Sequence, residues 1–366
     1  MRFFKFVFVA GFMRVRLGDV CEKGSSNLKQ SDVIDKNGEY EIYGASGLIG
    51  KVDFFHQEKP YIAVVKDGAG IGRTMLLPEK TSVIGTMQYI LPNEKVIPKY
   101  LYYVIRYMHL EKYFTGATIP HIYFKDYKRE EFNLCDLSEQ EKIVSTLSKI
   151  EKIITHRKQQ LEKLDLLVKA RFVEMFGEPE TNPLGWEKVT IADVCSSIVR
   201  GPFGSALKKD FFVEPDDTTY KVYEQKHAIQ KNAALGTYYI TEEKYKELKR
   251  FECVAGDILM SCSGTMGELY QLPTGCERGI INQALCKFTL NNRILPIVFL
   301  TYMQQTIGNL ETKGSGIQNI AAVSYVKAMP VNLPPLDIQQ QFADFVKQID
   351  KSRFITLKEN KESEIL

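Results

Sequence analysis

One stretch of the 366-residue sequence carries the residue types of a metal-dependent hydrolase. Asp216 is followed by Glu224 and then by Lys226. Two carboxylates can hold Mg²⁺ in such sites while a lysine orients the attacking water. The surrounding residues, Glu-Pro-Asp-Asp-Thr-Thr-Tyr-Lys-Val-Tyr-Glu-Gln-Lys, have the alternating pattern of a strand, and they lie in the inserted part of only one copy of an internal repeat described below. We therefore predict a half-exposed strand here and no catalytic residue.

A second stretch is close to a base-modifying motif. Asn332 begins Asn-Leu-Pro-Pro-Leu-Asp, whereas adenine methyltransferases grip a flipped base with Asn/Asp-Pro-Pro followed by an aromatic residue. Leu333 interrupts the Asn-Pro step and Leu336 replaces the aromatic. No glycine-rich cofactor loop following a strand accompanies it. The stretch is thus predicted to be a loop that enters a helix.

Cysteine and histidine do not form a metal-binding pattern. The seven cysteines are scattered and never form Cys-x-x-Cys, and the five histidines are far apart in the sequence. This usage is typical of reduced thiols in a cytoplasmic protein. We expect neither a metal site nor a cofactor in this chain.

A glycine-rich stretch occurs twice. Residues 256–273 read GDILMSCSGTMGELYQLP and end in Leu-Pro. Residues 66–73 read KDGAGIGR, and a short apolar stretch that ends in Leu-Pro follows them. Glycine permits positive φ and a close approach of the backbone to a neighbour. Two interpretations remain open: a hairpin turn that only packs, or a loop that lies against nucleic acid.

The two glycine stretches belong to a longer internal repeat. VRLGDVCE at Val15 corresponds to VTIADVCS at Val189, and LSEQEKIVSTLSKIEK at Leu137 corresponds to LDIQQQFADFVKQIDK at Leu336. The separation grows from roughly 175 to roughly 200 residues and then stays nearly constant, which indicates a duplicated domain with an insertion early in the second copy.

Each copy ends in a long predicted helix. Apolar residues alternate at spacings of four and three from Ser138, the predicted N-cap, to Gly177 and Pro179, which end the run. A helix of about 39 residues is roughly 58 Å long and needs a partner. The second helix supplies one, although it is shorter. We predict that the two helices pair as an antiparallel coiled coil; the alternative is two independent surface helices. The predicted pairing or subunit-docking residues are Ile143, Leu147, Ile150, Ile154, Leu161, Leu164, Phe342, Val346 and Ile349.

Short β-branched and aromatic runs alternate with Gly and Pro turns elsewhere in both copies, and two shorter helical stretches accompany them. We expect an α+β fold with two globular modules joined by the long helices. The predicted divisions are an N-terminal extension of uncertain role (1–13), a first module (14–136), a spacer helix (137–177), a linker (178–188), a second module (189–335) and a C-terminal helix (336–366).

This combination resembles the specificity (S) subunit of Type I restriction-modification systems. The features that carry the resemblance are two modules that each open with an xxLxDV-like segment, the GDILMSCSGTMG stretch, the PLDIQQQ entry into a helix, and FGEPETNPLGWEKV from Phe176 to Val189. Together they cover nearly the whole chain from Val15. None of them would suffice alone.

The resemblance implies a protein that recognises DNA and performs no catalysis. Each module would be a target recognition domain that reads one half of a bipartite, asymmetric site in double-stranded DNA. The helices would dock two methyltransferase (M) subunits, which carry S-adenosylmethionine. Motor-nuclease (R) subunits, which use ATP and Mg²⁺, would join for restriction. The implied location is cytoplasmic, with no membrane partner.

Polar and basic clusters supply the candidate DNA contacts, because Lys and Arg suit phosphates or guanine while Asn and Gln suit adenine. They lie in the glycine stretches, in TGATIPHIYFK, in TKGSGIQN and in VRGPFGSALKK. The candidates are Lys66, Arg73, Thr118, His121, Tyr123, Lys125, Arg200, Lys208, Lys209, Ser263, Lys313, Gln318 and Asn319.

Charge does not decide between DNA and other partners. The net charge of +3 comes from 48 basic and 45 acidic residues, so any nucleic-acid surface must arise from local clustering. The apolar N-terminal run is too short to span a bilayer.

The alternative to a DNA-recognising subunit is a non-catalytic coiled-coil interaction protein whose modules bind protein or carbohydrate. A steep dependence of binding on salt concentration would distinguish DNA binding from this alternative.

Overall fold

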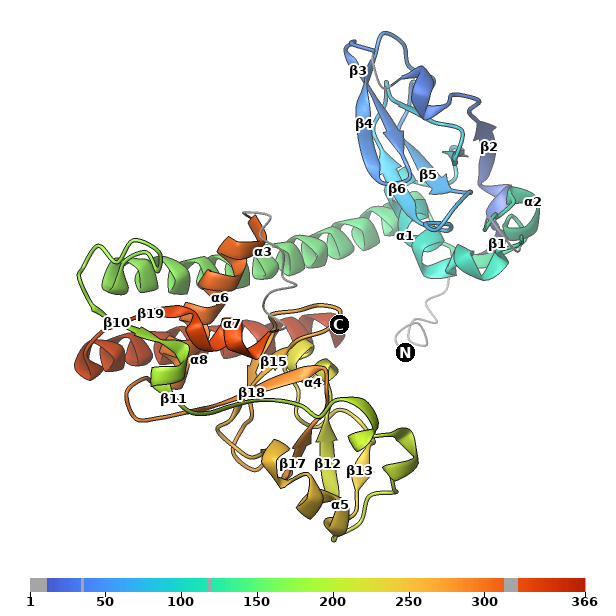
Figure 1. Ribbon diagram of the computed structural model, residues 1–366. Helices are drawn as coiled ribbons and strands as arrows, with labels where there is room; N and C mark the ends of the chain where they lie inside the picture. Colours follow the sequence, from blue (N-terminus) through green and yellow to red (C-terminus); the bar gives the residue numbers. More distant parts are fainter. Residues whose placement is uncertain (1–11, 34–35, 117–119, 313–321, 366) are drawn as a thin grey trace. The chain divides into compact units, whose positions relative to one another are not determined.

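The computed structural model describes residues 12–33, 36–116, 120–312 and 322–365 (Figure 1). The chain forms two compact units that divide inside its longest helix. The first unit is Met1–His156 with Ser363–Leu366, and the second is Arg157–Glu362. The predicted α+β class is confirmed, since both units combine strands and helices.

The first unit contains a four-stranded antiparallel sheet in the order β2-β8-β5-β6. A three-stranded sheet, β4-β3-β7, adjoins it in sequence, and β3 runs parallel to β7. Strands β1 and β9 form a separate antiparallel ribbon. The bounds are β1 (Met13–Arg16), β2 (Cys21–Ser25), β3 (Tyr40–Gly44), β4 (Gly47–Val52), β5 (Tyr61–Val65), β6 (Thr74–Leu77), β7 (Ser82–Val83), β8 (Met87–Pro92), β9 (Glu131–Leu134), α1 (Pro98–Met108) and α2 (Phe124–Tyr127).

Strand β5 is covered on both faces. All five of its residues are buried, which suits the continuous apolar run Tyr-Ile-Ala-Val-Val. Ile62 and Val64 pack in one core cluster with Leu101 and Ile105 of α1. Tyr61, Ala63 and Val65 point to the other face and join a second cluster with Met87 and Tyr89. The turn after β5 therefore follows a strand that is buried on both faces.

The second unit repeats this plan. Its four-stranded sheet has the order β11-β18-β15-β16, with every neighbouring pair antiparallel. A further sheet, β13-β12-β17-β14, contains the parallel pair β12–β17, and β10 pairs with β19. The bounds are β10 (Glu187–Thr190), β11 (Cys195–Arg200), β12 (Tyr220–Tyr223), β13 (Tyr239–Ile240), β14 (Glu252–Cys253), β15 (Ile258–Ser261), β16 (Leu269–Gln271), β17 (Gly279–Ile281), β18 (Leu285–Leu290), β19 (Pro330–Leu333), α4 (Gln225–Ile229), α5 (Glu242–Glu247), α6 (Pro296–Thr312) and α7 (Val323–Ala328).

The repeat in the sequence is therefore a repeat in the fold. The strands β2, β8, β5 and β6 correspond in order and direction to β11, β18, β15 and β16. The second unit adds α4, α5 and β14 between β12 and β15. These additions lie where the sequence separation of the two copies grows, as predicted for an insertion.

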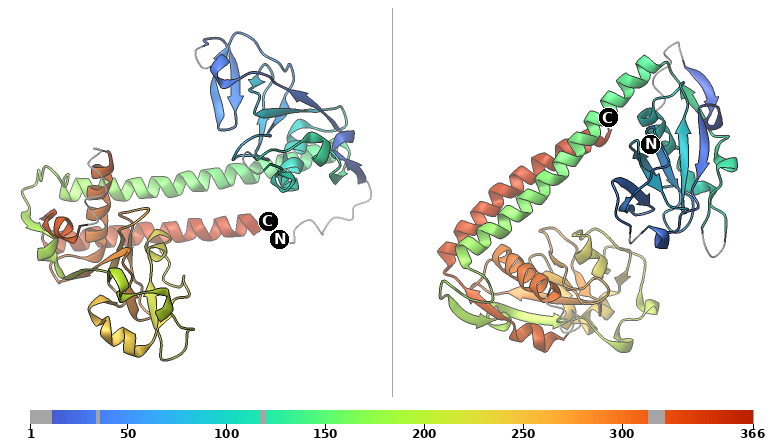
Figure 2. Two further views of the ribbon diagram at one scale, coloured as in Figure 1. Left: turned by 45° about the vertical axis from the view of Figure 1, so that its right-hand side comes forward. Right: turned by 90° about the horizontal axis from the view of Figure 1, so that it is seen from above.

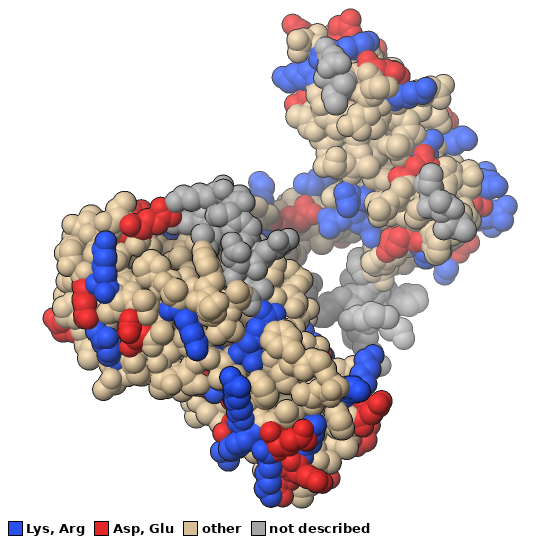
Figure 3. Space-filling model, in the orientation of Figure 1, with Lys and Arg blue, Asp and Glu red and all other residues tan. Residues whose placement is uncertain are grey.

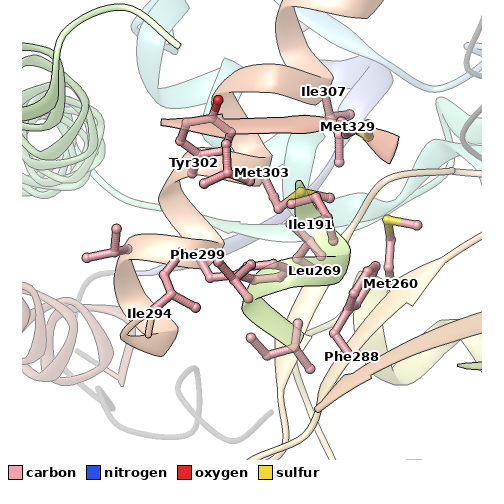
Figure 4. Close-up of a cluster of buried hydrophobic side chains, with 14 of the residues drawn as sticks. Ile191, Met260, Leu269, Phe288, Ile294, Phe299, Tyr302, Met303, Ile307 and Met329 are labelled. Carbon is pink, nitrogen blue, oxygen red and sulfur yellow. The ribbon is translucent and has the colours of Figure 1, made fainter. Parts of the chain in front are cut away.

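The largest core cluster of the second unit joins its sheet to the long helices. Met260 and Phe288 of the sheet pack with Phe299 and Met303 of α6 (Figure 4). The same cluster contains Val168, Phe172 and Phe176 of α3 and Phe342 and Val346 of α8. The module and the adjoining helix segments of this unit thus share one hydrophobic core.

The two long helices are α3 (Leu137–Phe176, 40 residues) and α8 (Leu336–Ile365, 30 residues). The second is the shorter, as expected from the sequence. The predicted cap of α3 is wrong: the Glu139 amide donates to Asp136 Oδ1 at 2.9 Å, so Asp136 caps the helix and Ser138 lies inside it. Gly177, with φ +78°, ends α3 as predicted.

Within the second unit, α3 and α8 lie side by side (Figure 2). The Phe172 and Phe342 ring centroids are 5.5 Å apart, and Arg353 pairs with Asp165 at 2.5 Å. Residues later in α8 thus contact residues earlier in α3, so the helices are antiparallel over this stretch. A coiled coil along their whole length stays a prediction.

The burial pattern of α3 follows the predicted spacing. Leu147, Ile150, Ile154, Leu161 and Leu164 are half-buried, whereas most residues between them are exposed. Ile143 has a different role from the one predicted, because it packs against the core of the first unit. In the second unit Val346 and Phe342 are buried and Ile349 packs against the same core.

The two enzyme-like stretches have structural roles. Residues 220–223 form a strand that is mostly buried rather than half-exposed. Asp216 accepts hydrogen bonds from the Thr218 amide and hydroxyl, at 2.7 and 2.8 Å. Asn332 is buried and donates to the Pro179 carbonyl at 2.7 Å, two residues before the Pro-Pro step that leads into α8. In the described part of the chain no helix is long and apolar enough to cross a membrane.

Candidate nucleic-acid interface

The β5–β6 turn of the first unit is held by backbone hydrogen bonds. The Gly72 amide donates to Val65 O at 2.9 Å, and the Val65 amide donates to Arg73 O at 2.9 Å. Gly72 has φ +81°, and a Cβ there would lie 2.6 Å from the Glu111 amide nitrogen. Glycine is required at this position because the turn approaches the backbone of the following segment closely.

This turn is joined to the second predicted cluster of the first unit. The Gly68 amide donates to Pro120 O, and the Ile122 amide donates to Lys66 O, both at 2.9 Å. Two stretches that are far apart in the sequence therefore form one surface. We call it the first-unit loop surface; its residues are Lys66, Asp67, Arg73, His121, Tyr123 and Lys125.

Side-chain contacts order the first-unit loop surface. The Asp67 carboxylate contacts His121 Nδ1 and forms an ion pair with Lys66 at 4.0 Å. The Tyr123 ring lies edge-on to the His121 ring, with centroids 4.1 Å apart, and Lys125 Nζ is 5.1 Å from the Tyr123 centroid. Arg73 is exposed and donates to Ala45 O at 3.1 Å. The surface thus presents basic and aromatic groups around one carboxylate.

The glycine stretch of the second unit forms the corresponding hairpin turn. The Gly267 amide donates to Ser261 O at 2.8 Å, and the Ser261 amide donates to Glu268 O at 2.9 Å, as in the first unit. The buried Ser261 hydroxyl donates to Thr265 O at 2.6 Å and accepts from the Glu268 amide at 2.9 Å. The stretch is thus a hairpin turn, and its position against nucleic acid stays a prediction. Ser263 lies half-buried in this turn.

Arg200, at the end of β11, reaches the same turn. It donates to Cys262 O at 3.5 Å and to Gln283 O at 3.4 Å, and its guanidinium carbon is 5.2 Å from the Phe203 ring centroid. Lys208 and Lys209 follow on an exposed segment. The structure therefore brings Arg200 and Ser263 together as one surface, which we call the second-unit loop surface: Arg200, Phe203 and Ser263.

Cys262, the residue after β15, and Cys286 of β18 are buried beneath that surface. The hydrogen bond with Cys262, and then burial, raise the pKa of the Cys286 thiol. Cys286 therefore stays protonated at neutral pH and serves as a packed, neutral support for the turn.

Equivalent positions carry different side chains in the two units. The Lys66 amide donates to Thr86 O and the Cys262 amide donates to Ala284 O, so Lys66 and Cys262 occupy the same register. By the same comparison Arg73 corresponds to Glu268, whose carboxylate pairs with Lys231 at 2.6 Å. The same backbone arrangement thus carries different side chains in the two units.

Four predicted contacts lie outside the described residues: Thr118, Lys313, Gln318 and Asn319. Sequence reasoning also missed two residues of the loop surfaces. Asp67 stands inside KDGAGIGR, where an acid between basic residues was the available signal. Phe203 stands between glycines in RGPFG, and an aromatic residue at a turn was the signal there.

On the face of the molecule in Figure 3, basic and acidic side chains are interspersed over both units. No surface of a single sign covers either unit on that face. This agrees with the small net charge of +3, and it leaves local clusters such as the two loop surfaces as the places where a polyanion would be bound.

A family model described as the Type I restriction modification DNA specificity domain matches residues 10–164 and again residues 183–366. The chain belongs to the Type I restriction-modification DNA specificity family. The resemblance drawn from the sequence is confirmed. Each match contains one of the two repeated globular modules, so this specificity subunit carries two copies of the domain.

Solved structures share the fold of this specificity subunit. The Type I restriction-modification S subunit from M. genitalium is 15% identical, with a TM-score of 0.59 over 99% of this chain and 95% of that chain. A chain from a study of complex assembly and conformational transition of the type I R-M system is also 15% identical, with a TM-score of 0.58 over 98% and 96%. No curated protein sequence matches the chain.

The specificity subunit is a DNA sequence-recognition protein of a Type I system, whose S subunits act with DNA and with M and R subunits. The alternative from the sequence, a coiled-coil protein that binds protein or carbohydrate, is not favoured by this membership.

Proposed function

We propose that each unit reads one half of a bipartite, asymmetric site in double-stranded DNA. The observation that supports this most strongly is the repeated four-stranded sheet with Lys66 in one unit where Cys262 stands in the other, and Arg73 where Glu268 stands. Direct readout depends on the groups presented to base edges. Two different sets of groups on one framework would read two different short sequences.

The long helices would set the distance between the two half-sites. Half-sites one helical turn apart are about 34 Å from each other along the duplex. A 40-residue helix such as α3 is about 60 Å long, which is enough to separate two recognition modules by that distance. The proposed divisions are the modules at 14–136 and 189–335 and the spacer helices at 137–177 and 336–366.

Catalysis would belong to the partners. In this proposal two M subunits, which carry S-adenosylmethionine, dock on the helices and methylate adenine at N6, and R subunits use ATP and Mg²⁺ for restriction. The specificity subunit itself contributes recognition and no catalytic residue, and it acts in the cytoplasm, where the DNA is. Its half-buried α3 residues Leu147, Ile150 and Ile154 suit a helix surface that is covered by another helix.

Methylation of host DNA tests the proposal. The full chain is expressed with the M subunit encoded next to it, and N6-methyladenine is mapped across the genome. We expect methylation at one bipartite, asymmetric motif, and no methylation when the specificity subunit is omitted. A symmetric or continuous motif would contradict the division of reading between two unlike units. Methylation that persists without this chain would show that specificity comes from elsewhere.

A further inference from the structure

Phe203 has an unusual exposure for its size and type. Its side chain is 66% exposed, the highest value among the large apolar residues of the described chain. An exposed phenylalanine ring gives up favourable burial of apolar area, and here it packs in none of the core clusters of the second unit. The folded chain therefore does not need this ring for its own core.

The backbone that carries Phe203 is nevertheless firmly held. The Gly201 amide donates to Leu285 O at 3.0 Å, and a Cβ at Gly201 would overlap the Asn282 carbonyl. Pro202 is buried. On the other side Gly204 has φ +70° with open space around it. The ring is exposed on a rigid support, in contrast to a side chain that is exposed because its loop is loose.

The equivalent position of the first unit is used differently. Strands β2 and β11 end at Ser25 and Arg200, which pair with Gln88 and Cys286 at the same register of the sheet. Leu28, the third residue after β2, packs against a core cluster of its own unit. Phe203, the third residue after β11, does not turn inward. Exposure of the ring is thus a property of this site rather than of the fold.

The neighbours of Phe203 belong to the second-unit loop surface. The Arg200 guanidinium lies over the ring at 5.2 Å and donates to the carbonyl of Cys262, next to Ser263. An aromatic ring beside a basic group at a surface that contacts DNA is the combination with which proteins enter a base step, because the ring replaces base stacking while the cation is near the phosphates. We propose that Phe203 inserts between adjacent base pairs of the half-site bound by the second unit.

This inference rests on the proposed function and extends it. Insertion unstacks one base step, and the cost depends on the sequence, being smallest at flexible pyrimidine–purine steps. Phe203 would therefore contribute to specificity without a hydrogen bond to any base. It would act only in the second half-site, because Leu28 replaces it in the first unit.

The test uses the full chain in complex with its M subunit. The probe is a duplex that contains the motif methylated by the wild-type complex, with 2-aminopurine placed in turn at successive positions of each half-site. We expect the wild-type complex to raise 2-aminopurine fluorescence at one step of one half-site. Phe203→Ala should abolish that rise and weaken binding about tenfold or more, whereas Phe203→Trp should retain both.

Matched variants separate insertion from folding and from simple charge. Leu184, which is 50% exposed in the linker, supplies the control: Leu184→Ala should leave affinity and fluorescence unchanged. Phe203→Ala should keep the thermal stability and the salt dependence of binding. Equal fluorescence for wild type and Phe203→Ala on a bound duplex overturns the insertion alone. A wild-type complex that methylates and binds no motif overturns the proposed function as well.

Discussion

Gln140 in α3 and Gln339 in α8 make the same three hydrogen bonds in the two units. Gln140 Oε1 accepts from the Ile97 amide at 2.8 Å, and its Nε2 donates to Lys95 O and Cys135 O at 3.0 and 2.9 Å. Gln339 makes the corresponding bonds to Leu295, Arg293 and Pro334, at 2.8, 2.9 and 2.8 Å. Both side chains are fully buried. Gln140 thus fastens the first turn of α3 to the start of α1, and Gln339 fastens the first turn of α8 to the start of α6.

Replacing either glutamine by leucine should destabilise the helix junction. Leucine keeps the approximate volume but leaves the Ile97 amide and two carbonyls without partners in the Gln140 variant, which costs about 1–3 kcal/mol for each unsatisfied group. Hydrogen exchange should accelerate at the Ile97 amide in Gln140→Leu and at the Leu295 amide in Gln339→Leu. Gln340→Leu is the control, because Gln340 is exposed. An equal effect in that variant would argue against a specific role of the buried glutamine hydrogen bonds.

Asp67→Asn should strengthen DNA binding that does not depend on sequence. The carboxylate contacts Lys66 and His121, so its negative charge opposes phosphates at the first-unit loop surface. Removing one charge should raise affinity for a duplex without the motif and increase the slope of log K against log salt by about one. Titrations at several salt concentrations measure this. Asp216→Asn, which removes a carboxylate capping a loop of the second unit, should leave the slope unchanged if the effect is local.

Phe172→Ala should open a cavity between the two long helices. Phe172 is 1% exposed and lies 4.7 Å from the Phe176 ring centroid and 5.5 Å from the Phe342 ring centroid. Loss of such a buried ring costs about 3–5 kcal/mol. Urea unfolding of the full chain should shift to lower concentration in this variant. Leu166→Ala, on the same helix at 61% exposure, should change the midpoint little.

Ile154→Asp should weaken capture of the M subunit. Ile154 is half-buried at a position that continues the apolar spacing of α3. A carboxylate there would have to be desolvated under a covering helix. The amount of M subunit that co-purifies with the variant should fall. Unchanged co-purification would contradict a docking role, and Lys158→Asp at an exposed position of the same helix controls for the added charge.

The second unit should lose stability as pH falls below about 6.5, the ordinary pKa of histidine. His227 is fully buried; its Nε2 donates to Leu235 O at 2.5 Å and its Nδ1 accepts from the Glu224 amide at 2.9 Å. Burial lowers the pKa of His227, although the carbonyls of Glu224 and Leu235 oppose this. The unfolded chain therefore binds the proton more readily, and the stabilisation present at higher pH is lost on acidification.

Urea midpoints at pH 7.5 and pH 5.5 measure the histidine effect. His227→Gln cannot take up this proton, so its midpoint should change less between the two pH values than that of the wild type. His156→Gln, at an exposed position of α3, should retain the wild-type difference. A wild-type difference that survives in His227→Gln would assign the pH dependence to other groups.

The long helices and the glycine turns were accessible from the sequence because they rest on local signals, and the repeat and the family because similar segments recur in the same order along the chain. The spacing of Leu147, Ile150 and Ile154 is a periodicity along one chain, and the glycines at Gly72 and Gly267 mark turns with positive φ. Such signals involve neighbours within a few residues. The N-cap was misassigned for the same reason: Asp136 and Ser138 both suit a cap, and only the path of the backbone selects Asp136.

By itself, the amino-acid sequence determined that this protein has two copies of one α+β module, that each copy ends in a long helix, and that both belong to a DNA specificity family. Only the tertiary structure decided that Asp67 meets His121, that Phe172 and Phe176 pack against Phe342, and that Phe203 remains exposed. These facts depend on which distant segments pack together. The packing of distant segments is decided by burial of the whole core, and a local sequence pattern does not contain that information.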